Sequence, residues 1–171
     1  MTEKGINSKK KLYLAAPLFS ESELKYNIDL KSILSPYFEV FLPQEDGELI
    51  LNLIKKGVSK RAAANEIFNS DIKAIEGCDI ILVVLDGRVI DEGAAFELGL
   101  AFALGKKCVG FQTDIRRLLP IGNNPMIDCA LEITLTSIEE LLDWAKTQSS
   151  SEITDKRKNL KLFSEFNIFD R

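Results

Sequence analysis

The run "CDIILVVLDG", residues 78–87, decides the fold that the sequence predicts. Its apolar residues follow one another without a polar interruption, which indicates a strand covered on both faces, as in a parallel sheet. A strong helical pattern, with Ser59 as its cap and Gly77 near its end, precedes it over 59–77. A second helix is expected directly after it, over 91–107. A helix on either side of a buried strand is typical of a βαβ arrangement.

The rest of the chain continues this alternation. Ser20 and Glu23 have the spacing of a capping box, as do Ser137 and Glu140, so each pair predicts a helix start. The other expected strands are 11–19 (running into a loop), 38–43, 106–112 and 131–136, and the other helices are 20–34, a turn or two in 47–57, and 137–147. This order predicts an α/β fold: a doubly wound five-stranded parallel sheet of flavodoxin-like order 2-1-3-4-5, with helices on both faces. That order opens a crevice beyond the carboxyl ends of strands one and three.

Composition narrows the class of protein. The chain has 171 residues, of which 46% are hydrophobic and 28% charged, with a net charge of −4. These values suit one globular domain and make a nucleic-acid polymer an unexpected partner. No apolar run approaches the roughly 20 residues of a membrane helix. The three cysteines lie far apart in or beside apolar runs, so we expect buried free thiols in a reducing cytoplasm.

The two ends of the chain differ from its middle. Residues 1–10 lack the apolar segment of a signal peptide and are expected to be a flexible N-terminus. Residues 11–147 form the expected domain. The tail, 148–171, begins with Gln148 followed by "SSSE" and carries three phenylalanines near its end. That is too apolar for a solvated tail, so we expect it to pack on its own domain or on a neighbouring subunit.

Carboxylates at unusual positions indicate the functional site. Glu97 is the one charge in the apolar helix between Gly93 and Gly105. It needs either a basic partner or a cavity, because an unpaired buried carboxylate is costly. Asp71 is likewise a carboxylate on an apolar stripe, that of the preceding helix. A position at the boundary between the apolar and polar faces of that helix also explains it. Asp91 precedes the Glu97 helix, where an N-cap is its ordinary use.

Taken together, these acids favour one chemistry. Asp91 and Glu97 flank one helix start at the expected crevice, and Gly93 leaves room there for a ligand to approach the backbone. Histidine is absent, which removes Ser-His and Cys-His catalysis. With no metal-ligand cluster and no phosphate-binding glycine loop, we expect neither a metal nor a cofactor. What remains is a carboxylate that attacks a sugar carbon while a second group handles the leaving group's proton.

Two stretches carry a resemblance to a known family. The run "DIKAIEGCDIILVVLDGRVIDEGAAFELGLAFALGKK" and the start "LYLAAPLF" resemble the nucleoside 2-deoxyribosyltransferase family, over most of residues 11–145. The most specific part is Asp71 joined to the D-x-G-x-x-x-E spacing from Asp91 to Glu97. The resemblance implies exchange of the base of a 2'-deoxynucleoside for another purine or pyrimidine, with retention, through a deoxyribosyl ester on Glu97.

The resemblance also assigns roles to individual residues. Tyr13 matches a strand-one tyrosine that hydrogen-bonds the nucleophile, although an inward-facing sheet tyrosine is equally ordinary. Asp91 would protonate the departing base and Asp71 would hold a base. Phe19 would stack on the base, or else be a core phenylalanine at a loop. Gln44 would touch the base or the sugar hydroxyls.

The family builds its site at a subunit interface, which implies a homo-oligomer that binds small deoxynucleosides and free nucleobases. The loop "PIGNNPMID" is the expected donor across the interface, with Asn124 chosen although Asn123 is equally available. A turn-forming Asn-Asn-Pro segment is the ordinary alternative.

Two other functions stay open. A related 2'-deoxynucleoside 5'-monophosphate N-glycosidase would use the same glutamate with water, but "AAPLFSES" lacks the glycine and arginine expected around a phosphate. A non-catalytic nucleotide-binding module on the same fold is the second.

Overall fold

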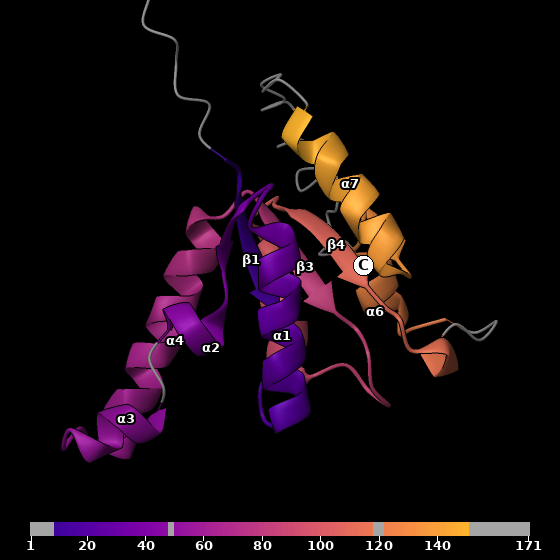
Figure 1. Ribbon diagram of the computed structural model, residues 1–171. Helices are drawn as coiled ribbons and strands as arrows, with labels where there is room; N and C mark the ends of the chain where they lie inside the picture. Colours follow the sequence, from indigo (N-terminus) through magenta and orange to yellow (C-terminus); the bar gives the residue numbers. More distant parts are fainter. Residues whose placement is uncertain (1–8, 48–49, 118–121, 151–171) are drawn as a thin grey trace, which may run out of the picture.

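A five-stranded parallel sheet forms the centre of the molecule (Figure 1). The computed structural model describes residues 9–47, 50–117 and 122–150. The strand order is β2-β1-β3-β4-β5, and every neighbouring pair is parallel, which confirms the predicted fold. The strands are β1 (Lys11–Ala15), β2 (Glu39–Phe41), β3 (Ile80–Val84), β4 (Lys107–Phe111) and β5 (Ile133–Leu135).

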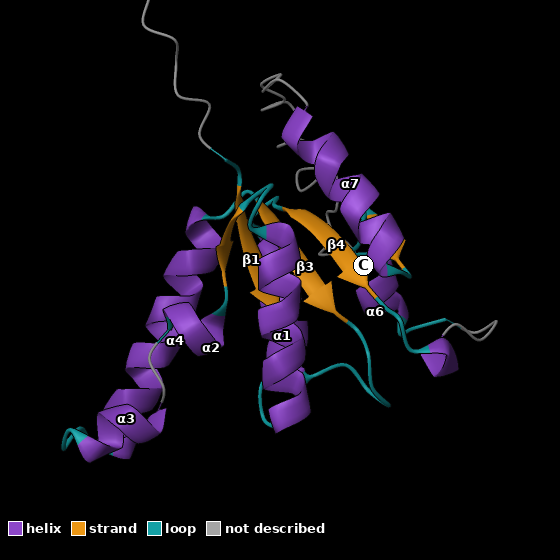
Figure 2. Ribbon diagram, viewed as in Figure 1, coloured by secondary structure: helices purple, strands orange, loops and turns teal. Residues whose placement is uncertain are grey.

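Helices cover both faces of this sheet (Figure 2). One buried cluster joins α1 and α7 to one face, and a second cluster joins α4 and α5 to the other. The helices are α1 (Glu21–Leu34), α2 (Pro43–Asp46), α3 (Ile50–Lys55), α4 (Lys60–Gly77), α5 (Glu92–Ala103), α6 (Pro125–Asp128) and α7 (Ile138–Ser150), with a 3-10 turn, η1 (Ile115–Arg117).

The central strand β3 is apolar throughout because it is covered on both faces. All five of its residues are buried. Ile80, Leu82 and Val84 join the α1–α7 cluster, whereas Ile81 and Val83 join the α4–α5 cluster. Because successive side chains of a strand point to opposite faces, a strand covered on both sides needs apolar residues at every position.

Local signals in the sequence locate the helix starts. Ser20 caps α1 in a full capping box with Glu23, and Ser59 accepts a hydrogen bond from Ala62 N at the start of α4. The short helices α2 and α6 were not predicted. Each begins with a proline in its first turn, where a missing N–H costs no helical hydrogen bond.

Some expectations need correction or fall outside the described residues. Cys78 and Cys108 are buried, but Cys129 is exposed because it follows the short surface helix α6. Helix α7 continues to Ser150, beyond the end expected for this helix at 147. Residues 1–8 of the expected N-terminus and 151–171 of the expected tail lie outside the described residues. No helix in the described ranges is long and apolar enough to cross a membrane.

Candidate active site

A short hydrogen bond links the sheet to the carboxylate of α5. Tyr13 Oη donates to Glu97 Oε1 at 2.6 Å. Tyr13 is fully buried on β1, on the face that α4 and α5 cover. Within the described part of the chain, no lysine or arginine forms an ion pair with Glu97. The carboxylate is therefore held by a neutral donor, not neutralised by a cation.

Glu97 opens onto a cavity of about 480 Å³ between α4 and α5. Asp71 and Gly93 line the same cavity, and the remaining walls are apolar: Ala64, Ile67, Phe68, Ile72, Ile75 and Phe96. The rings of Phe68 and Phe96 lie 6.0 Å apart at 48°. Both rings are more than half exposed, so the cavity is accessible from solvent. Two carboxylates thus face an apolar hollow of the size that small ligands occupy.

The apolar surroundings change the acidity of both carboxylates. Burial raises the pKa of Glu97 to about 7, and the charges of Asp71 and Asp91 add to the rise. The hydrogen bond from Tyr13 lowers that pKa but offsets only part of the effect. Burial likewise raises the pKa of Asp71 to about 6. For Tyr13, burial and then the Glu97 charge raise the pKa well above its usual 10.0, so the phenol stays a donor.

Asp91 begins the helix that carries Glu97. Its Oδ2 accepts a hydrogen bond from Ala94 N at 2.9 Å, so the N-cap role is present. A Cβ added to Gly93 would lie 3.0 Å from that same oxygen. The glycine therefore leaves space for the cap beside the cavity. The Asp91 charge also acts on Glu97, which places both acids in one electrostatic environment.

A second hollow, of about 330 Å³, lies at the carboxyl ends of β1 and β3, where the strand order predicts a crevice. Phe19 is on its wall and 80% exposed. Asp91 is on its wall as well, with Glu23, Asp86, Glu92 and Arg88. Asp86 is already bound there: its carboxylate accepts from Thr113 N, Thr113 Oγ1 and Asp114 N, which ties the end of β3 to the end of β4.

Two predicted site residues line neither of these two hollows and form no hydrogen bond with Glu97. Gln44 lies in α2, where its Nε2 donates to Leu24 O and its Oε1 accepts from the buried Asn27. Asn124 is exposed and caps α6 by accepting a hydrogen bond from Met126 N. Within the single chain, both side chains therefore have local structural partners.

Two cavity residues were missed by the sequence reasoning. Phe68 and Phe96 form an aromatic pair at the opening. Phe68 precedes Asp71 by one helical turn, and Phe96 precedes Glu97 directly. Their exposure was the missing information, because in the sequence each reads as an ordinary apolar helix residue. In the described ranges, no group of three or more His, Cys, Asp or Glu is arranged to hold a metal ion.

Known proteins share this fold and this sequence pattern. The sequence profile described as "Nucleoside 2-deoxyribosyltransferase" matches residues 12–161. The chain belongs to the nucleoside 2-deoxyribosyltransferase family. The match includes Tyr13, Asp71, Asp91 and Glu97, so the cavity between α4 and α5 lies within the family domain.

Individual relatives of this family domain include one curated protein and solved structures. An uncharacterized protein of Ureaplasma parvum serovar 3 is 31% identical over 105 residues, which cover 59% of this chain but only 65% of that protein. A conserved protein from Enterococcus faecalis V583 is 25% identical, with a TM-score of 0.67, over 82% of this chain and 99% of that one. A 2-deoxyribosyltransferase from Bacillus psychrosaccharolyticus is 26% identical, with a TM-score of 0.64, over 78% of this chain and 90% of that one.

Proposed function

We propose that this protein exchanges the base of a 2'-deoxynucleoside for another purine or pyrimidine, through a covalent deoxyribosyl ester on Glu97. One observation carries the proposal: a carboxylate with no cationic partner among the described residues borders an apolar cavity and accepts a 2.6 Å hydrogen bond from a buried tyrosine. A nucleophile needs a fixed orientation and free access, and this arrangement supports both. The family membership supports the choice of substrate.

The proposed reaction has two balanced displacements. In the first, a carboxylate oxygen of Glu97 forms a bond to C1', the C1'–N bond breaks, and its electron pair stays on the base, which takes a proton from an enzyme acid. In the second, a nitrogen of the incoming base bonds to C1' and the ester bond breaks. This step regenerates the carboxylate, and the proton of the incoming base returns to the acid. Two inversions at C1' give overall retention.

Asp71 and Asp91 are the candidates for the acid. The resemblance implies Asp91, whereas the geometry favours Asp71. Asp71 borders the same cavity as Glu97, and its pKa of about 6 keeps a larger share of it protonated near neutral pH than an ordinary aspartate. Asp91 already uses Oδ2 to cap α5. We therefore assign proton transfer to Asp71, with Asp91 contacting the sugar side of the site.

The aromatic residues provide two surfaces that suit a base. Phe68 and Phe96 lie at the opening of the Glu97 cavity, and Phe19 lies on the wall of the second hollow. A flat, weakly polar ring gains by covering such exposed aromatic faces. The homo-oligomer that the resemblance implies would complete the site with polar groups from a neighbouring chain, for which Asn124 on its exposed turn remains our candidate.

The charge of the second hollow favours a nucleoside over a nucleoside 5'-monophosphate as the substrate. The second hollow, at the carboxyl ends of β1 and β3, is lined by the acids Glu23, Asp86, Asp91 and Glu92. Arg88 is the one cation on its wall among the described residues. A phosphate would meet a net negative surface there. This observation supports the transferase against the N-glycosidase.

The test is incubation of the full-length protein with deoxyinosine and free adenine, without phosphate, with deoxyadenosine measured by chromatography. Wild type is expected to form deoxyadenosine, and Glu97→Gln to lose at least about a thousandfold of the rate, since an amide cannot form the ester. Glu66→Gln is the matched control, because Glu66 is an exposed glutamate on α4 outside the cavity.

Three results would contradict the proposal. Free deoxyribose without base exchange would indicate the hydrolase. Nucleoside binding without turnover, unchanged in Glu97→Gln, would indicate a binding module. Full exchange activity in Glu97→Ala would remove Glu97 from the mechanism altogether.

A further inference from the structure

Phe41 is packed against the tyrosine that holds Glu97. The parallel register of β1 and β2 places Phe41 directly opposite Tyr13. Their rings are stacked, with centroids 5.4 Å apart and planes inclined by 17°. On its other side, Tyr13 is opposite Ile81 of β3. The phenol ring is therefore flanked on both sides by cross-strand neighbours on the same face of the sheet.

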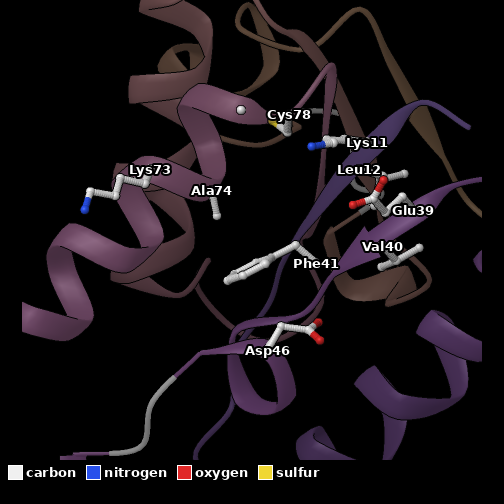
Figure 3. Close-up of a pocket in the computed structure, with 10 residues that line it drawn as sticks. Lys11, Leu12, Glu39, Val40, Phe41, Asp46, Lys73, Ala74 and Cys78 are labelled. Carbon is white, nitrogen blue, oxygen red and sulfur yellow. The ribbon is translucent and has the colours of Figure 1, made fainter. Parts of the chain in front are cut away.

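Phe41 stands between Tyr13 and an open cavity. β2 is the edge strand, and a hollow of about 330 Å³ lies between it and the end of α4. Figure 3 shows the ring of Phe41 extending from β2 towards Ala74 on α4, with the charged side chains of Lys11, Glu39 and Asp46 around the hollow. On the edge side of the sheet, Phe41 is thus the side chain that separates the Tyr13 ring from this space.

We propose that Phe41 is a positioning residue that holds the Tyr13 ring in the orientation needed to donate to Glu97. The inference rests on the proposed function for its consequence in catalysis, but the hydrogen bond itself is independent of that function. Phe41 is not among the residues lining the Glu97 cavity, so its effect passes through Tyr13. A stacked aromatic pair in a sheet adds stability beyond that of its buried area. That is enough to favour one ring orientation.

The charged groups that face Glu97 make the consequence measurable. Among the described residues, Tyr13 of β1 is the one partner that lowers the pKa of Glu97, while Asp71 of α4 and Asp91 at the start of α5 both raise it. When the ring of Tyr13 is free to turn towards the edge cavity, its hydrogen bond to Glu97 weakens. The rise that Asp71 and Asp91 cause in the pKa of Glu97 is then no longer offset. The pKa of Glu97 then rises further.

The experiment is a titration of the Glu97 carboxyl carbon by NMR in the full-length protein, in wild type, Phe41→Leu, Phe41→Ala and Phe41→Trp. We expect the pKa to rise by about half a unit or more in Phe41→Leu and Phe41→Ala, and to stay near the wild-type value in Phe41→Trp, where an aromatic face remains. Phe41→Leu fills most of the volume, so it covers the case in which Phe41→Ala fails to fold. The titration needs no substrate, so its result stands even if the base-exchange proposal fails.

A double-mutant cycle with Tyr13→Phe separates positioning from a direct effect. Because Phe41 acts through the hydroxyl, Phe41→Leu is expected to leave the Glu97 pKa unchanged once that hydroxyl is absent. Val40→Ala is the matched control, since Val40 is on the same strand but packs on the opposite face. An unchanged pKa in Phe41→Leu, an equal shift in the Tyr13→Phe background, or an equal shift in Val40→Ala would each overturn the proposal.

Discussion

At the scale of single residues, the site depends on a balance between burial and one hydrogen bond. Burial raises the pKa of Glu97 and the donor on Tyr13 lowers it, with a net value of about 7. The carboxylate is thus partly protonated at neutral pH. It is a stronger nucleophile when ionised than an ordinary glutamate would be, because nucleophilicity increases with basicity.

Removal of the Tyr13 hydroxyl tests this balance. In Tyr13→Phe the lowering contribution disappears, so the pKa of Glu97 is expected to rise above 7. In an Asp71→Asn background, where the ionisation of Glu97 alone shapes the pH–rate profile, the acidic limb of kcat/KM for base exchange should then move to higher pH by roughly half a unit to one unit on adding Tyr13→Phe. An acidic limb that keeps its midpoint on adding Tyr13→Phe would show that Tyr13 does not act on the ionisation of Glu97.

The requirement for a protonated Asp71 carboxyl produces the alkaline limb of the pH–rate profile. If Glu97 reacts as the anion and Asp71 as the acid, kcat/KM should be highest between pH about 6 and about 7, and fall on both sides. Asp71→Asn should reduce the rate by roughly 10²–10⁴-fold, as expected for loss of a proton donor, and remove the descending alkaline limb. Steady-state rates from pH 5 to 9 provide the measurement. A retained alkaline limb in Asp71→Asn would return the donor role to Asp91.

At the scale of elements, α5 connects catalysis to folding. The helix is anchored on the sheet by Leu98 and Ala101, and its first turn is capped by Asp91. Because Glu97 lies within two turns of that cap, a change at the start of the helix also reaches the nucleophile. The two roles of Asp91, cap and substrate contact, can nevertheless be separated by choosing the substitution.

Asp91→Ala and Asp91→Asn form the matched pair. Asparagine can still cap the helix, whereas alanine cannot, so the free energy of unfolding should fall by about 1 kcal/mol in Asp91→Ala and change little in Asp91→Asn. Urea unfolding measures this difference. Base exchange in both variants shows the second role: an equal loss in both indicates contact with substrate, and a loss in Asp91→Ala alone indicates the cap only.

At the scale of the whole molecule, the site reduces stability at neutral and alkaline pH. The folded state raises the pKa of Glu97 from 4.5 to about 7, so it favours the protonated form. The protonated Glu97 carboxyl makes its full contribution to the stability of the folded state below pH 4.5, and this contribution is lost as the pH rises through 7. The shift corresponds to about 3 kcal/mol, since one pKa unit is about 1.4 kcal/mol.

Glu97→Gln should therefore stabilise the protein at high pH. The melting temperature of this variant should exceed that of wild type by roughly 5–10 °C at pH 8, and the difference should vanish near pH 4.5. Calorimetry across this pH range gives the comparison, with Glu66→Gln as an exposed control that should show no such trend. A constant difference between Glu97→Gln and wild type at all pH values would contradict the assigned ionisation.

Local chemistry in the sequence was enough for the fold. The unbroken apolar run of β3, the capping box of Ser20 and Glu23, and the alternation of patterns predicted the sheet order and the helical layers, because these signals come from residues close together in the chain. Motif spacing likewise selected Glu97, Asp71 and Asp91, and the family match includes all three positions.

Tertiary structure alone decided how those residues meet. The Tyr13–Glu97 hydrogen bond, the Phe41 stack and the aromatic rim of Phe68 and Phe96 join residues from β1, β2, α4 and α5. The raised pKa of Glu97 also belongs to this level, since it depends on how much water the packed helices exclude. Covalent order along the chain determines which residues share an element, but distances across elements depend on packing, and acidity and orientation follow from those distances.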